Sequence, residues 1–234
     1  MSVPMIPPVS AADSTAWTMI VAAGAGEESA RERFARTYGA VIRMYLAARW
    51  QLPTTHEAVD DGTQEVFVQC FKPAGALQGV DPAGPARFRS YLYAVVRHVA
   101  DRIERTNAVR RTPQEPSGAG LDDLARNEAT LSRVFDRAWV GMVTRGAWLL
   151  MVQHLDGTAT GRDRLQILDL RFKDGLTPAE IAQRLGLETD YVYQQLRNSK
   201  RDFRTALLEV VGSYHPGASK DEVEARCLDL VGLL

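Results

Sequence analysis

The segment from Leu176 to Phe203 constrains the fold of this chain most, because it encodes two helices and the turn between them. Its sequence is LTPAEIAQRLGLETDYVYQQLRNSKRDF. Thr177 is an N-cap residue, Pro178 suits the first helical position, and Glu180 completes a capping box with Thr177. Gly186 stands where a left-handed turn ends a helix. We therefore predict a helix that starts at Pro178, a tight turn at Gly186 and a second helix.

The second predicted helix has one apolar face and one polar, basic face. We expect Thr189 to cap it, and four apolar residues form its buried face: Val192, Leu196, Phe203 and Leu207. The opposite face carries side chains that can bind base edges and phosphates: Tyr193, Gln194, Arg197, Asn198, Lys200 and Arg201. Residues 197–204 hold four basic residues and one acidic residue, a local charge of +3. This pattern is typical of a helix-turn-helix that places its second helix in the major groove of DNA. A solvated face in an all-helical protein is the alternative.

The rest of the chain also indicates helices. Apolar residues recur at spacings of three and four, and no long alternating strand pattern occurs. We therefore predict an all-α protein with two small helical domains joined by a flexible linker. Residues 1–26 form a tail and a short helix that Gly24 and Gly26 end, and residues 27–111 the first domain. Residues 112–123 form the linker, 124–213 the helix-turn-helix domain and 214–234 a C-terminal helical extension.

A second informative segment is RFRSYLYAVVRHVADRIER, residues 87–105. It places aromatic residues beside arginines on one predicted helix. Aromatic rings stack on unpaired bases, and arginines bind the backbone of a single strand, so this composition suits single-stranded nucleic acid. Burial of Phe88 and Tyr91 in the core is the alternative, and composition alone favours it.

Charge and composition exclude several classes of protein. The chain has 28 basic and 29 acidic residues, a net charge of -1, so any contact with nucleic acid must come from a local basic surface. A hydrophobic fraction of 45% argues against disorder. The two cysteines, Cys70 and Cys227, form no C-x-x-C pair, and we expect reduced thiols. We find neither an apolar run of about 18 residues nor a basic residue before Arg31, and we therefore expect a cytoplasmic protein without membrane contact.

The sequence carries no pattern of a catalytic, metal or cofactor site. The four histidines are scattered along the chain: His56, His98, His154 and His215. Glycine-rich phosphate loops and nucleophile motifs are missing. Asp60 and Asp61 are adjacent, and adjacent side chains on a helix point about 100° apart, so they do not converge on one ligand. We therefore expect no enzyme activity, no catalytic residue, no metal and no cofactor.

Three segments together resemble bacterial sigma factors, in the extracytoplasmic-function branch of the sigma-70 family. DDGTQEVFVQCF, which starts at Asp60, is similar to the family's polymerase-binding helix, and residues 87–105 resemble its strand-opening helix. Residues 176–203 resemble its second DNA-binding domain. TAWTMIVAAGAG, FDRAW at Phe135 and EVEARCLDLVGLL look like one subgroup of this branch. The order and separation of these segments make the resemblance specific, since no single motif is diagnostic.

The resemblance implies a region 2-like domain over residues 27–111 and a region 4-like domain over 124–213. It implies core RNA polymerase and promoter DNA as partners, and it allows an anti-sigma factor or another regulator. The polymerase-binding residues would be Asp60, Asp61, Gln64, Glu65 and Phe67. The residues that meet the minus-ten element would be Arg87, Phe88, Arg89, Tyr91, Arg97, His98, Arg102 and Arg105. The residues that meet the minus-thirty-five element would be Tyr193, Gln194, Arg197, Asn198, Lys200 and Arg201.

The chain departs from the family pattern at two of these positions. The family often has tryptophan where Tyr91 stands and arginine where Asn198 stands. Two other functions stay open: a stand-alone helix-turn-helix regulator that binds duplex DNA as a dimer, and a helical antagonist that binds polymerase without reading DNA. The acidic and aromatic segment 60–71 argues against the first. Gln194 and Arg197 on an exposed helix argue against the second.

Overall fold

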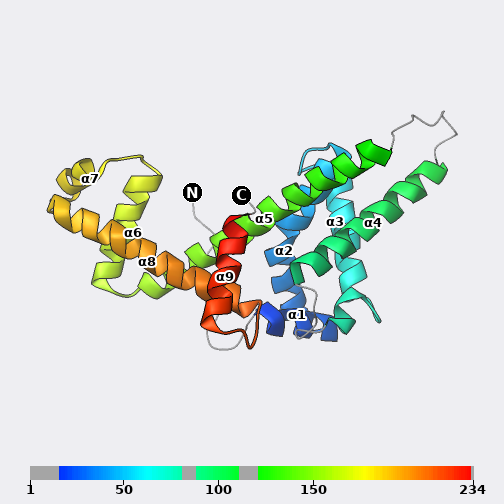
Figure 1. Cartoon of the computed structure of the whole chain (residues 1–234), viewed down its shortest axis with the longest axis horizontal. Coiled ribbons are helices and arrows are strands. Elements are labelled where there is room, and N and C mark those ends of the chain that lie inside the picture. Colours follow the sequence, from blue (N-terminus) through cyan, green and yellow to red (C-terminus); the bar gives the residue numbers. More distant parts are fainter. Residues whose placement is uncertain (1–15, 81–87, 111–120, 233–234) are drawn as a thin grey trace. The chain divides into compact units, whose positions relative to one another are not determined.

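The computed structural model describes residues 16–80, 88–110 and 121–232. Over these residues the chain forms nine α-helices and one 3-10 turn, and no strand (Figure 1). The prediction of an all-α protein is therefore confirmed. Predictions that concern residues 1–15, 81–87 and 111–120 lie outside the described residues, and they include Arg87 and most of the predicted linker.

The chain divides into two compact units. The first contains the described residues up to Trp139 together with Ser213–Gly217, and the second contains Val140–Gly212 and Ala218–Gly232. The boundary falls inside helix α5 (Leu121–Leu155) rather than at the predicted linker 112–123. Residues 124–139, which the prediction assigns to the second domain, belong to the first unit because Phe135 and Trp139 are buried there.

The first unit consists of helices around an aromatic core. Its helices are α1 (Ala16–Ala25), α2 (Glu28–Trp50), α3 (Glu57–Phe71), α4 (Phe88–Arg110) and the first half of α5, with the 3-10 turn at Ala76–Gly79. Helix α3 contacts both α2 and α4 (Figure 1). The ring of Phe135 lies 5.2 Å from the ring of Tyr93 and 6.2 Å from that of Tyr45, measured between centroids. These ring contacts attach α5 to α2 and α4.

Gly24 lies inside α1 instead of ending it, which corrects the sequence prediction. A Cβ atom at this position would lie 2.8 Å from the carbonyl oxygen of Leu77, so glycine allows α1 to approach the 3-10 turn closely. Gly26 has φ +104°, a left-handed conformation that favours glycine, and α1 ends just before it.

The second unit contains the end of α5, α6 (Ala159–Phe172), α7 (Pro178–Leu185), α8 (Thr189–Ser213) and α9 (Lys220–Val231). It has two apolar clusters. One is formed by Ala147, Met151, Leu155, Leu168 and Ala206. The other is formed by Ile167, Leu170, Ile181, Ala182 and Val192. The second cluster joins α6, α7 and α8.

The short segment after α8 belongs to the first unit. The indole Nε1 of Trp17 donates a hydrogen bond of 2.7 Å to the carbonyl oxygen of Tyr214. The Tyr214 ring lies 5.4 Å from the Trp139 ring, and its hydroxyl lies 3.3 Å from that of Tyr38. Tyr214 therefore completes an aromatic cluster whose other members come from the N-terminal part of the chain.

Candidate nucleic-acid interface

The predicted helix-turn-helix is present as α7 and α8. The backbone N–H of Glu180 donates to Thr177 Oγ1 at 3.3 Å, and the N–H of Thr177 donates to Glu180 Oε2 at 2.7 Å. The N–H and the hydroxyl of Thr177 both donate to Glu180 Oε2, and these two hydrogen bonds lower the pKa of Glu180. Gly186 has φ +66°, the left-handed conformation expected at the end of α7. The capping box and the glycine turn are both confirmed.

Thr189 does not cap α8, because the helix begins at this residue. The N–H of Val192 donates to the carbonyl oxygen of Glu188 at 3.2 Å, which gives Glu188 the capping position. Ile181 and Val192 are fully buried where α7 and α8 meet, while Leu196, Phe203 and Leu207 are partly buried. The predicted inner face of α8 is therefore observed.

The outer face of α8 carries the residues predicted to read DNA. Tyr193 is 52% exposed. The other exposed residues are Gln194, Arg197, Lys200, Arg201 and Arg204, and Asn198 is half-buried. Positions 193, 197, 200 and 204 follow the i, i+4, i+7 and i+11 spacing of one helix face. We call Arg197, Lys200, Arg201 and Arg204 the basic stripe.

Three members of the basic stripe have no ion-pair partner among the described residues: Arg197, Lys200 and Arg201. The fourth, Arg204, lies 3.4 Å from Glu224 of α9, and both side chains are solvent-accessible. The stripe thus keeps a net positive charge on an exposed helical face. Such a surface binds phosphates, and the adjacent Gln194 and Arg197 have the donors that recognise adenine and guanine edges.

The inner face of α8 holds a polar cluster that the sequence analysis missed. Arg164 of α6 donates through Nε to Gln195 Oε1 at 3.0 Å, and its Nη1 pairs with Asp202. Gln195 is only 3% exposed. The signal in the sequence is the pair of polar residues, Gln195 and Asp202, seven positions apart on the mostly apolar inner face of α8.

The first unit buries one residue predicted to contact DNA. Phe88 is 3% exposed, and its ring packs against those of Trp17 and Tyr38. The core alternative therefore holds for Phe88, and its assignment to the minus-ten element is corrected. Tyr91 is half-buried, and its hydroxyl donates to the carbonyl oxygen of Ala76.

Three arginines of α4 are paired with carboxylates of the same unit. Arg89 Nη2 lies 2.7 Å from Asp136 Oδ1, and Arg97 Nε lies 3.3 Å from Glu128 Oε1. Arg102 pairs with Glu65. His98 and Arg105 are exposed, and neither has an ion-pair partner in the part of the chain that the structure describes. Arg89, Arg97 and Arg102 would have to exchange a carboxylate for a phosphate in order to bind DNA.

Glu128 of α5 interacts with two side chains of α4, those of Arg97 and Tyr93. Besides pairing with Arg97, it accepts a hydrogen bond of 2.5 Å from the Tyr93 hydroxyl. Burial, together with this hydrogen bond, raises the pKa of Tyr93. Burial also raises the pKa of Asp136, and the charge of Arg89 opposes that shift. Helix α5 therefore presents two carboxylates to the face of α4 that carries Arg89 and Arg97.

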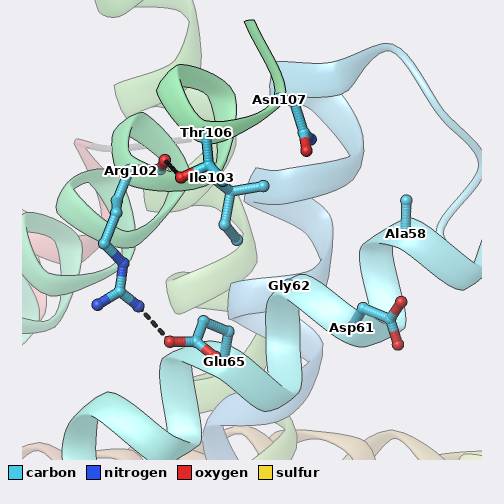
Figure 2. A pocket seen from close by; sticks show the side chains of 8 residues that line it. All are labelled: Ala58, Asp61, Gly62, Glu65, Arg102, Ile103, Thr106 and Asn107. Atoms are coloured by element: carbon cyan, nitrogen blue, oxygen red, sulfur yellow. Dashed lines mark hydrogen bonds and ion pairs between the residues drawn. The ribbon is translucent and has the colours of Figure 1, made fainter. Parts of the chain in front are cut away.

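A pocket of about 440 Å³ lies between α3 and α4. It is lined by Ala58, Asp61, Gly62, Glu65, Arg102, Ile103, Thr106 and Asn107. Figure 2 shows Arg102 and Glu65 pointing toward each other, while Asp61 stands on the α3 side. The pocket therefore brings two predicted polymerase-binding residues next to one residue predicted to bind DNA.

The other predicted polymerase-binding residues differ in exposure. Asp61 and Gln64 are exposed. Asp60 is half-buried and pairs with Arg43 of α2. Phe67 is half-buried, with its ring stacked 6.0 Å from that of Phe71. The exposed face of α3 is thus acidic and polar around Asp61 and Gln64.

Other kinds of site are not found in the described residues. They contain no group of three or more His, Cys, Asp or Glu side chains placed to hold a metal ion. Among the described helices, none is long and apolar enough to cross a membrane. No protein-family model and no curated protein matches the chain.

Proposed function

We propose that this chain is a sigma factor that binds core RNA polymerase in the cytoplasm and directs promoter-specific initiation of transcription. The observation that carries the proposal is the α7–α8 pair with its exposed basic stripe. The proposal also rests on the resemblance of α3, α4 and the helix-turn-helix to the corresponding sigma-factor segments. The proposed action involves binding alone, without a covalent step and without a cofactor.

Helix α8 would read the minus-thirty-five element. In a helix-turn-helix the second helix enters the major groove with its N-terminal residues against base edges. Gln194 and Arg197 stand in the first three turns of α8 and are exposed. The other members of the basic stripe follow them along the helix and would bind the phosphates beside the groove.

The first unit would bind polymerase through α3 and the single-stranded minus-ten element through α4. Three of the α4 arginines are paired with carboxylates, so the free chain should bind single strands weakly. This supports a protein that acts together with polymerase better than one that binds DNA alone. Polymerase would supply the additional phosphate contacts that the nearly neutral chain lacks.

The test is binding to bacterial core RNA polymerase, followed by run-off transcription on genomic DNA. We expect a stable complex and new, discrete start sites. Asp61→Lys reverses an exposed charge on α3 and should weaken the complex. Glu209→Lys makes the same change on an exposed position of α8 and should leave the complex intact.

The other outcomes identify the rival functions. Specific binding of the free chain to duplex DNA, without any complex with polymerase, would identify a stand-alone regulator. A complex with polymerase that starts no transcripts at any added genomic fragment would identify an antagonist.

A further inference from the structure

Arg164 links α6 to the inner face of α8 through two directional contacts. Its side chain is 12% exposed. Its Nε donates to Gln195 Oε1 at 3.0 Å, and its Nη1 pairs with Asp202. Gln195 is 3% exposed, so its amide depends on partners inside the protein.

The two partners of Arg164 lie two helical turns apart. A spacing of seven residues places Gln195 and Asp202 on one face of α8, and at about 100° per residue this face points away from Arg197 and Lys200. A rotation of α8 by one residue would carry both partners away from the guanidinium. The planar fork of Arg164 therefore fixes the rotation of α8 about its own axis, and with it the direction of the base-facing side chains.

The apolar clusters of the second unit fix which face of α8 is buried, but they define its rotation less sharply than the Arg164 contacts do. Val192 packs with Ile167 and Ile181, and this burial stabilises α8 against α6 and α7. The hydrophobic effect depends on buried area and is non-directional, so it tolerates small rotations. Hydrogen bonds lose strength steeply when their angle changes, so the contacts of Arg164 do not tolerate small rotations of α8.

We propose that Arg164 is a positioning residue that sets the base specificity of α8. The inference rests on the proposed reading of DNA by this helix. Arg164 touches no DNA in this scheme and acts only through Gln195 and Asp202. Because phosphate contacts carry no sequence information, its loss should reduce discrimination between sequences while non-specific binding stays.

The decisive variant is the double substitution Arg164→Met/Gln195→Leu in the full chain. It removes both buried polar groups together, which avoids leaving an unpaired one in the core. Asp202 keeps 25% of its side chain exposed and can be solvated. The matched control is Lys173→Met, which removes the same charge from the end of α6, where the side chain is 71% exposed.

The probe is a pool of random-sequence DNA duplexes, from which the full wild-type chain, bound to core RNA polymerase, selects its preferred sequence. Affinities are then measured for that duplex and for a scrambled one. We expect the double variant to lower the ratio of the two affinities about tenfold, with the scrambled duplex bound within about twofold of wild type. The control should keep the wild-type ratio. Thermal unfolding should show that the double variant is folded.

The conservative variant Arg164→Lys separates charge from geometry. Lysine keeps the positive charge but lacks the planar fork that reaches two partners. We expect the lysine variant to keep only part of the wild-type ratio of affinities for the selected and the scrambled duplex. A wild-type ratio of affinities in the double variant, or in Arg164→Lys, would overturn the positioning role of Arg164. The proposed reading of DNA by α8 would not be affected. If the wild-type chain enriches no sequence at all, DNA reading by α8 and the role of Arg164 both fail.

Discussion

Arg49, near the end of α2, joins two helices of the first unit through one side chain. Its Nε donates to Glu104 Oε1 at 2.7 Å, its Nη1 donates to the Tyr45 hydroxyl at 3.0 Å, and its Nη2 pairs with Asp101. Trp50 donates to the same Glu104 carboxylate. The hydrogen bond to Glu104 raises the pKa of Arg49. This network fixes α4 against α2.

We predict that Arg49→Met lowers the free energy of unfolding by about 2 kcal/mol. The variant leaves Asp101 and Glu104 without their cationic partner, although Trp50 still donates to Glu104, and partial exposure of both carboxylates limits the loss. Urea denaturation at neutral pH measures it. Arg36→Met, which breaks an exposed pair with Glu32, should cost no more than about 0.5 kcal/mol. Equal losses in the two variants would contradict a special role for Arg49.

The sequence could not identify such partners. A basic residue near the end of a predicted helix has no distinct signature, and Glu104 lies 55 residues away from Arg49. The same limit applies to the arginines of α4. Their pattern in the sequence suggested side chains that are free to contact nucleic acid. Their carboxylate partners lie on other helices, so pairing depends on the tertiary fold and is invisible to local spacing.

At the scale of elements, the sequence predicted most where the signals are local. The start and end of α7 followed from Thr177, Glu180 and Gly186, because capping and left-handed turns depend on residues within one turn of the helix. The prediction failed at Gly24, where the reason for a glycine is the backbone of Leu77. In the sequence, a glycine that allows two distant segments to approach closely cannot be distinguished from a glycine that ends a helix.

The capping box at α7 leads to a prediction about pH. Hydrogen bonds from Thr177 lower the pKa of Glu180 below its ordinary value of 4.5. A folded pKa below the unfolded one stabilises the fold above the unfolded pKa, and this stabilisation is lost as pH falls through the folded pKa. Glu180→Gln keeps the shape of the cap but removes the charge.

We therefore expect Glu180→Gln to be less thermostable than the wild-type chain at neutral pH. The difference in melting temperature should vanish well below pH 4.5. Circular dichroism melts across this range provide the measurement. Glu209→Gln is the control on an exposed glutamate of α8 outside any helix cap and should show a smaller pH-dependent difference. A difference in melting temperature that persists at acidic pH would show that the charge of Glu180 is not its cause.

At the scale of the whole molecule, the net charge of -1 conceals an uneven distribution. The basic stripe of the second unit is mostly unpaired, whereas the first unit pairs Arg89, Arg97 and Arg102 internally. Composition indicated only that a basic surface must be local. It could not show which unit neutralises its own arginines.

We predict that Glu128→Gln strengthens binding of the free chain to a single-stranded oligonucleotide by about threefold, since it releases Arg97 from an exposed pair. The salt dependence should become steeper by about 0.7, the value for one added phosphate contact on a single strand. Fluorescence anisotropy with labelled oligo-dT at several salt concentrations measures both quantities. Glu32→Gln removes the same charge from α2 and serves as the control. Identical gains from both variants would attribute the effect to overall charge.

The boundary between the units was also beyond sequence reasoning. A linker was expected at 112–123 from its proline and glycine content. The units instead divide inside α5, whose helical periodicity continues without a break from Leu121 to Leu155. Phe135 and Met151 are both buried in this helix, one in each unit, and only the tertiary structure shows that their surroundings differ.

The position of Tyr214 has a consequence for folding during synthesis. The hydrogen bond from Trp17 to Tyr214 spans 197 residues of sequence. The ribosome releases roughly 5–20 residues per second, so several seconds separate the emergence of Trp139 from that of Tyr214. During that interval the nascent first unit holds Trp17, Tyr38 and Trp139 without their contacts to Tyr214. The first unit, most of which emerges first, is therefore completed only after helix α8 of the second unit has left the ribosome.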